Sequence, residues 1–184
     1  MTAFGGRHVA TLLVAMAAAG PAGARDVAVQ PPARETFSSP GGSYQFELAI
    51  TQPGASGFAT GTLRHAGNRD FVLDWQRVLK QPVRPRYALV ADDGTVALFA
   101  RWENVKSGIA IELIDPRGRT VASPGFDDIV RASGIPATEI VHLAKHAVWI
   151  DSLPQLVGQT ARVGIAGRTL SLDLGDGSLR VLPR

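Results

Sequence analysis

Two histidines four positions apart, His142 and His146, are the residues whose spacing comes nearest to a metal-binding pair. On a helix this spacing places two imidazoles on one face, where they can share a zinc ion. The neighbouring Val141 and Leu143 instead indicate strands, in which residues four apart stand roughly 13 Å from each other. A tight turn at 144–145 would let the rings face each other, but no third ligand follows. We therefore expect a solvated histidine pair beside a turn, and no metal site.

Two acidic clusters contain the oxygen atoms that calcium prefers: Asp92-Asp93-Gly94 and the stretch 173–177, DLGDG. Neither continues into the regular ligand series of a calcium loop, and neither supplies its late glutamate. Aspartate beside glycine is also the usual chemistry of a tight turn. The sequence therefore favours two turns without a bound ion.

The sequence contains few of the motifs that are typical of nucleophilic catalysis. It has no G-x-S-x-G elbow and no cysteine. His65 has Asp70 as a candidate partner but no evident serine nucleophile, and a helix start explains the adjacent carboxylates Asp127 and Asp128. The alternative hypothesis of a small exported hydrolase or carbohydrate-active protein requires a deep pocket assembled from distant loops. The titratable residues that would converge there are His65, Asp70, His142 and His146.

Four basic side chains, Arg77, Lys80, Arg84 and Arg86, fall within ten residues of a proline-containing connector. One interpretation is a solvated connector that the prolines stiffen. The other is a patch for an anionic envelope component or an acidic protein partner, whose attraction would weaken with salt. Trp102, at the end of an expected strand, either packs into the core or contributes to the same kind of partner surface.

The first 24 residues have the pattern of a signal peptide. Arg7 gives a basic start, residues 9–19 form an uncharged apolar run, and 21–24 end in small residues that a signal peptidase accepts. The apolar run is shorter than the roughly 20 residues of a spanning helix. We expect cleavage after Ala24 and a periplasmic or secreted product with no transmembrane segment. Lipid anchoring is not expected, because no cysteine follows the cleavage point.

Cleavage would leave 160 of the 184 residues, enough for one domain with a sizeable core. With no cysteine, its stability must come from that core and from hydrogen-bond ladders. Without Arg7 the chain carries 18 basic and 16 acidic side chains, a net charge of +2. That charge is too small to indicate nucleic-acid binding. No cofactor is predicted.

Period-two alternation of apolar and polar residues, bounded by turn residues, predicts strands over most of the mature chain. The polar segment 25–39 is expected to be a leader with little secondary structure, followed by a single β domain over 40–184. The expected strands lie near residues 43–50, 58–65, 70–74, 86–91, 95–101, 108–114, 119–122, 138–143, 146–150, 161–166, 168–174 and 178–182.

A repeat of about 51 residues organises these strands. The matching pairs are Ser56–Ala59 with Ser107–Ala110, Gly67 with Gly118, Trp75 with Phe126, Val78–Leu79 with Ile129–Val130, Pro85 with Pro136, and Val90 with Val141, all separated by 51 positions. The turn glycines Gly42 and Gly94 are 52 apart. Residues 75–79 and 126–130 are apolar at positions one, four and five, which predicts a short helix after each set of strands, the first capped by Asp74.

Repeats of this length built from about four strands are typical of propeller blades. The chain resembles uncharacterised secreted bacterial proteins in which a D-D-G turn, here Asp92-Asp93-Gly94, precedes a strand ending in tryptophan, here Trp102. The resemblance covers about Ser39 to Leu182. It implies a mainly β fold of two to three propeller-blade-like antiparallel units, too few to close a ring and therefore open or sandwich-like. The expected function is binding to a protein or envelope partner.

Overall fold

The computed structural model describes residues 32–50, 58–81, 83–101, 106–143 and 149–183. The chain divides into two units, Met1–Gln30 and Pro31–Arg184, and the description below concerns the second. The expected signal peptide, Trp102 and His146 lie outside the described residues. Within the described ranges, the helices are too short or too polar to cross a membrane.

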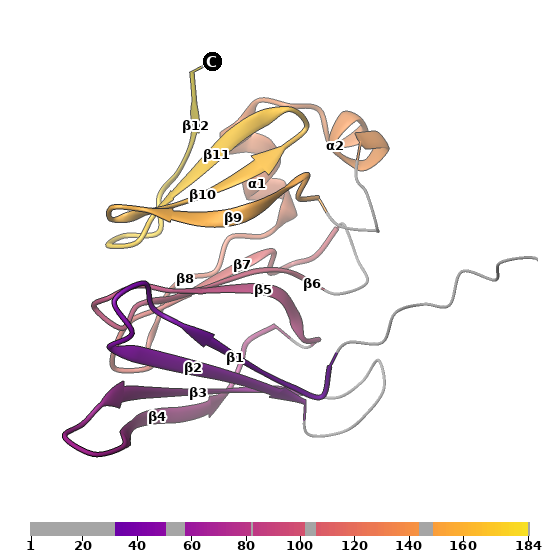
Figure 1. Ribbon diagram of the computed structural model, residues 1–184. Helices are drawn as coiled ribbons and strands as arrows, with labels where there is room; N and C mark the ends of the chain where they lie inside the picture. Colours follow the sequence, from indigo (N-terminus) through magenta and orange to yellow (C-terminus); the bar gives the residue numbers. More distant parts are fainter. Residues whose placement is uncertain (1–31, 51–57, 82, 102–105, 144–148, 184) are drawn as a thin grey trace, which may run out of the picture. The chain divides into compact units, whose positions relative to one another are not determined.

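Three four-stranded antiparallel sheets make up the second unit in the described residues (Figure 1). The first sheet contains β1 (Arg34–Ser38), β2 (Tyr44–Ile50), β3 (Ala59–Ala66) and β4 (Phe71–Val78). The second contains β5 (Pro85–Val90), β6 (Val96–Arg101), β7 (Ile111–Ile114) and β8 (Thr120–Ala122). The helices α1 (Phe126–Ser133) and α2 (Ala137–Leu143) follow. The third sheet contains β9 (Ser152–Val157), β10 (Thr160–Ile165), β11 (Arg168–Asp173) and β12 (Leu179–Leu182). The expected mainly β fold is confirmed.

The second sheet is buried on both of its faces. Val96 and Leu98 of β6 belong to a hydrophobic cluster shared with the first sheet. Ala97 and Phe99 of the same strand belong to a second cluster, shared with the helices and the third sheet. Because both faces exclude water, β6 is apolar at five consecutive positions, 96–100, instead of alternating.

The three sheets follow one plan, with their strands paired in chain order. The first strands of successive sheets contact each other, β1 with β5 and β5 with β9. This arrangement of edge strands is the one expected of successive propeller blades. The sheets stay open and do not close into a ring, as the sequence predicted.

The repeated turn glycines mark two hairpins that touch each other. The turn before β2 and the turn before β6 both contain a glycine of positive φ, Gly42 at 72° and Gly94 at 87°. Asp92 of the second turn accepts a hydrogen bond at 2.7 Å from the backbone N–H of Gly41 in the first. The recurrence along the chain therefore reflects blades stacked in register, in which corresponding turns are neighbours.

Gly94 gives a first test of this packing. Its left-handed φ costs a side-chain-bearing residue about 1–2 kcal/mol, and an added Cβ would lie 2.8 Å from the Tyr44 ring. We expect Gly94→Ala to lower the free energy of unfolding in urea by about 1–3 kcal/mol more than Gly158→Ala. Gly158 is the matched control, because its φ is 58° and an added Cβ there meets nothing within 4 Å. Equal losses would show that Tyr44 does not pack on this turn.

The end of the polar leader is not irregular, contrary to expectation. Arg34–Ser38 forms β1, paired with β2 from Arg34 opposite Ala49 to Ser38 opposite Gln45. Only Phe37 of this strand packs against the hydrophobic cluster. An edge strand with one apolar contact is stabilised mainly by its hydrogen-bond ladder, and side-chain periodicity does not reveal that contribution.

The short helix expected at 75–79 is also wrong, because β4 continues through Val78. Trp75 pairs with Leu63 while Leu73 pairs with Arg64, so Asp74 is the extra residue of a bulge and not a helix cap. The expected helix near 126 is confirmed as α1. Trp75 and Phe126 thus occupy different elements and different hydrophobic clusters, and the repeat alignment fails at this pair.

Two further elements differ from expectation between the second and third sheets. Residues 138–143 form most of α2 and not a strand, with Ile140 buried in the core. Of the strand expected at 146–150, residues 144–148 lie outside the described chain and 149–150 are not in a strand. Strand β9 was not predicted, because Pro154 interrupts it. β9 forms an edge of the third sheet, where a proline is tolerated.

Helix α1 begins and ends where its sequence directs. The backbone N–H of Gly125 donates to Asp128 at 2.9 Å, and this hydrogen bond, with the neighbouring Arg131, lowers the pKa of the Asp128 carboxyl. At the other end Gly134 adopts a φ of 63° and its N–H bonds to Val130. Asp128 therefore has a structural role that accounts for its position.

Candidate functional site

The basic residues of the connector do not form a shared surface patch. Arg77 points between the first and second sheets and forms an ion pair with Glu112, whose side chain is completely buried. Its Nη1 donates to the carbonyl of Gly118 at 2.6 Å, and its Nη2 donates to Thr120 at 2.9 Å. The backbone N–H of Lys80 reaches the other Glu112 oxygen at 3.0 Å. Arg77 thus joins two sheets.

Arg84 and Arg86 are engaged as well. Arg84 is only 1% exposed and forms an ion pair with Glu35 of β1. Arg86 is half-buried and lies 6.0 Å from the centre of the Tyr87 ring. Of the four predicted basic residues, Lys80 alone is fully at the surface. The ionic partners lie 35 and 49 positions away in the sequence, so the local pattern contains no sign of them.

His65 has a different partner from the predicted one. Its Nδ1 lies 2.7 Å from Asp74, the bulge residue of β4, and its ring lies 6.5 Å from that of Tyr44. Neither His65 nor Asp70 lines the hollows of the third sheet or the hollow beside the start of α1. His142 lies in α2. In the described part of the chain we find no group of three side chains able to hold a metal ion.

The acidic clusters are turns, as predicted. Asp93 accepts the N–H of Thr95 at 2.9 Å, and Asp173 accepts that of Gly175 at 2.8 Å. Asp176 accepts the N–H of Ser178 at 2.8 Å, and this bond lowers the pKa of Asp176. The aspartate oxygens thus stabilise backbone conformations.

A surface that the sequence did not single out lies on the third sheet, on the side away from the hydrophobic core. We call it the outer face. The strand register places four of its residues in one row across the sheet: Gln155 of β9, Arg162 of β10, Ser171 of β11 and Arg180 of β12. The alternate residues, including Val163 and Leu172, belong to the core.

The two arginines of this row are exposed, and Ser171 between them is 2% exposed. No ion pair between described residues involves Arg162 or Arg180. Asp173, at the end of β11, directs its Oδ1 to the turn N–H groups of Gly175 and Asp176. The row therefore carries two positive charges that the described chain leaves unneutralised.

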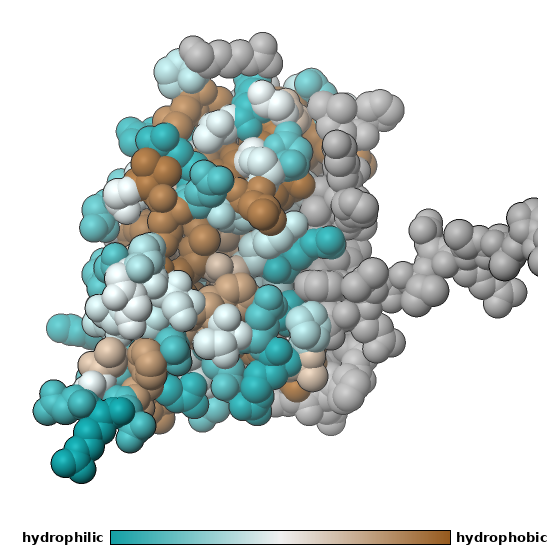
Figure 2. Space-filling view, viewed as in Figure 1, coloured by the Kyte–Doolittle hydropathy of each residue, from teal (hydrophilic) through white to brown (hydrophobic). Residues whose placement is uncertain are grey.

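The outer face is hollowed rather than flat. A hollow of about 390 Å³ is bordered by polar residues, including Arg162 and Thr169, and by Leu153 and Val157 of the edge strand β9. Leu153 is 66% exposed and Val157 is 40% exposed. Figure 2 shows both hydrophobic and hydrophilic residues at the surface in the upper part of the view, where Figure 1 places the third sheet.

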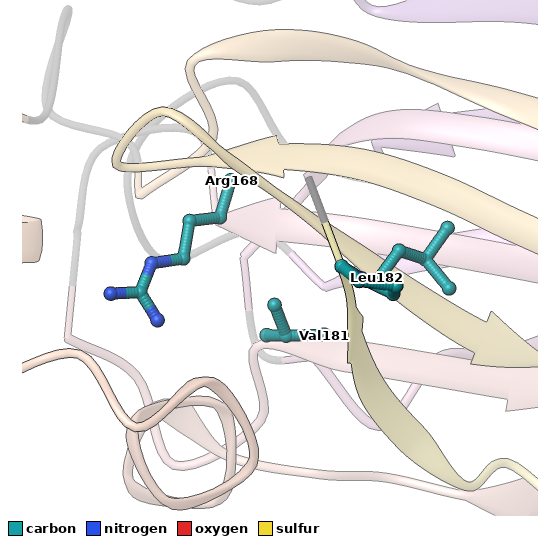
Figure 3. Close-up of a pocket in the computed structure, with 4 residues that line it drawn as sticks. Arg168, Val181 and Leu182 are labelled. Carbon is teal, nitrogen blue, oxygen red and sulfur yellow. The ribbon is translucent and has the colours of Figure 1, made fainter.

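A second hollow, of about 500 Å³, lies at the end of β12. Arg168, Val181, Leu182 and Pro183 line it. Figure 3 shows Arg168 and Leu182 on opposite sides of Val181. Leu182 and Pro183 border both hollows, so the end of β12 separates them. Alternation in residues 161–165 is enough to predict that Arg162 points outward, but the row across four strands appears only in the folded sheet.

The fold and this surface define a mainly β protein of three blade-like sheets with an arginine-bearing outer face. No protein-family model matches the chain, and no curated protein matches it. Among solved structures it is similar to the crystal structure of HIRA(644-1017), with a TM-score of 0.48 and 14% sequence identity. The match covers 81% of this chain and 37% of that chain, so this chain spans little more than a third of its length. The resemblance to secreted bacterial proteins stays a prediction.

Proposed function

We propose that this protein is an interaction module that binds a protein partner in the periplasm or outside the cell, and that it acts by binding and not by catalysis. The observation that supports this proposal best is the outer face of the third sheet. There, Arg162 lies beside the exposed aliphatic side chains Leu153 and Val157, and arginine with apolar neighbours is a composition typical of protein interfaces.

The proposed location rests on the signal-peptide pattern of the first 24 residues. The proposed mode of action rests on the side chains that the sequence offered for catalysis. His65 is hydrogen-bonded to Asp74 on the first sheet, and it does not line the hollows of the third sheet or the hollow beside the start of α1. No observation favours the hydrolase alternative over binding.

Site-specific photocrosslinking in living cells tests the proposal. A photoreactive amino acid at Gln155, which is exposed on the outer face, is expected to give a discrete crosslinked protein product. The same amino acid at Arg117, which is exposed in the turn before β8, serves as the control and should give none. Amino-terminal sequencing of the crosslinked product should show that this protein begins at Arg25 if export and cleavage occur as proposed. Identical products at both positions, or no product at 155, would refute binding through this face.

A further inference from the structure

Resting on that proposed function, we infer that the row Gln155, Arg162, Ser171 and Arg180 recognises an extended, acidic segment of the partner protein. The first step is charge. Arg162 and Arg180 have no carboxylate partner among the described residues, so a bound carboxylate would replace water and not an existing ion pair. Guanidinium groups hold carboxylates through two parallel hydrogen bonds.

The first sheet, on the side away from its hydrophobic cluster, provides the contrast within the same molecule. There Glu47 lies between two arginines on neighbouring strands, 2.9 Å from Arg34 and 3.9 Å from Arg64. On the third sheet the residue between the two arginines is Ser171, which carries no charge. The first sheet therefore neutralises its own arginines, whereas the third sheet has no acidic side chain at the position between Arg162 and Arg180.

The second step is spacing. Arg162 and Arg180 are separated by one intervening strand, which places their backbones about 10 Å apart. Side chains two residues apart on an extended peptide point to the same side at about 7 Å, and long arginine side chains can converge to that distance. Two acidic residues separated by one position thus match the row.

The third step distinguishes a peptide from other anions. The hollow that contains Arg162 also contains Leu153 and Val157, which are exposed. An acidic protein segment can supply carboxylates to the arginines and apolar side chains to these two residues. A sulfated polysaccharide or a lipid headgroup supplies only the charge, so the combined surface favours a peptide.

Binding of labelled poly-L-glutamate to the full mature protein, followed by fluorescence anisotropy, tests the inference. We expect Arg162→Gln/Arg180→Gln to weaken binding at least about tenfold at low salt. The control Arg69→Gln/Arg117→Gln makes the same charge change at exposed residues near the other two sheets, and it should change affinity less than about twofold. Arg162→Lys/Arg180→Lys should bind with intermediate affinity, because lysine keeps the charge and loses the paired hydrogen bonds.

A glutamate–leucine copolymer should bind more tightly than poly-L-glutamate, and Leu153→Gln should remove that advantage. Equal weakening by the two glutamine double variants would overturn the inference, as would tighter binding to dextran sulfate or to vesicles of anionic lipid than to the copolymer. The crosslink at position 155 separates the two levels of the proposal. If the crosslink persists in Arg162→Gln/Arg180→Gln, the outer face binds a partner but does not recognise its acidic residues. If it is absent from the wild type, the proposed function itself fails.

Discussion

Replacing Arg77 by methionine is expected to lower the free energy of unfolding by about 3–5 kcal/mol. Arg77 is the ionic partner of Glu112, whose side chain has no exposed surface. Methionine would leave this buried carboxylate with only Thr120 and the N–H of Lys80 as hydrogen-bond donors. A buried charge without its counter-ion is among the costliest defects a fold can carry. Urea unfolding monitored by circular dichroism gives the difference.

The control is Arg119→Met, which removes an arginine from a surface pair. Arg119 is 72% exposed and lies 2.7 Å from Asp115, four residues away. Exposed pairs of this kind contribute about 0–1 kcal/mol. The double variant Arg77→Met/Glu112→Leu should recover most of the loss, because it removes the orphaned charge together with its partner. A loss from Arg77→Met no greater than that from Arg119→Met would show that Glu112 does not depend on this ion pair.

Trp75→Ala is the second substitution with a large expected effect, a loss of about 3–5 kcal/mol. The Trp75 side chain is 8% exposed, and its ring centre lies 5.9 Å from that of Phe46. It also packs on the turn before β8, where a Cβ added to Gly118 would lie 2.9 Å from its Cγ. Alanine would leave a cavity between the first sheet and that turn, and the same urea unfolding measures its cost.

Two companion variants make the result specific. Phe71→Ala removes another aromatic ring from β4, but Phe71 is 37% exposed, so its loss should be less than half as large. Trp75→Phe should cost less than Trp75→Ala, because it keeps a ring and removes an indole N–H that has no hydrogen-bond partner among the described residues. Similar losses from Trp75→Ala and Phe71→Ala would contradict the packing of Trp75 between the sheets.

Arg77 and Trp75 both stabilise the contact between the first and second sheets. The outer face belongs to the third sheet, which packs through the other hydrophobic cluster. Substitutions at Arg77 or Trp75 should therefore change stability, whereas those at Arg162 and Arg180 should change binding with little effect on stability.

Features that depend on neighbouring residues could be predicted from the amino-acid sequence alone. Alternating side chains predicted β2, β3, β10 and β11, and an apolar run next to the Asp92-Asp93-Gly94 turn predicted β6. Aspartate and glycine predicted the turns, including those at Gly42 and Gly94. The recurrence of this turn along the chain indicated successive blades. These signals are readable because a strand's alternation and a turn's positive φ are local properties.

Features that depend on residues distant in the sequence became visible only in the folded protein. The polar segment Arg34–Ser38 forms β1 because its backbone pairs with that of β2. Residues 75–78 continue β4 because β3 pairs with them on the far side of a bulge. Arg77 and Arg84 do not contribute to the expected surface patch, because each forms an ion pair with a glutamate of another sheet. Arg77 pairs with Glu112, and Arg84 pairs with Glu35. The arginine row of the third sheet likewise exists only once three turns have placed its four strands side by side. Such pairings are set by the register of the folded sheets, which local side-chain patterns do not encode.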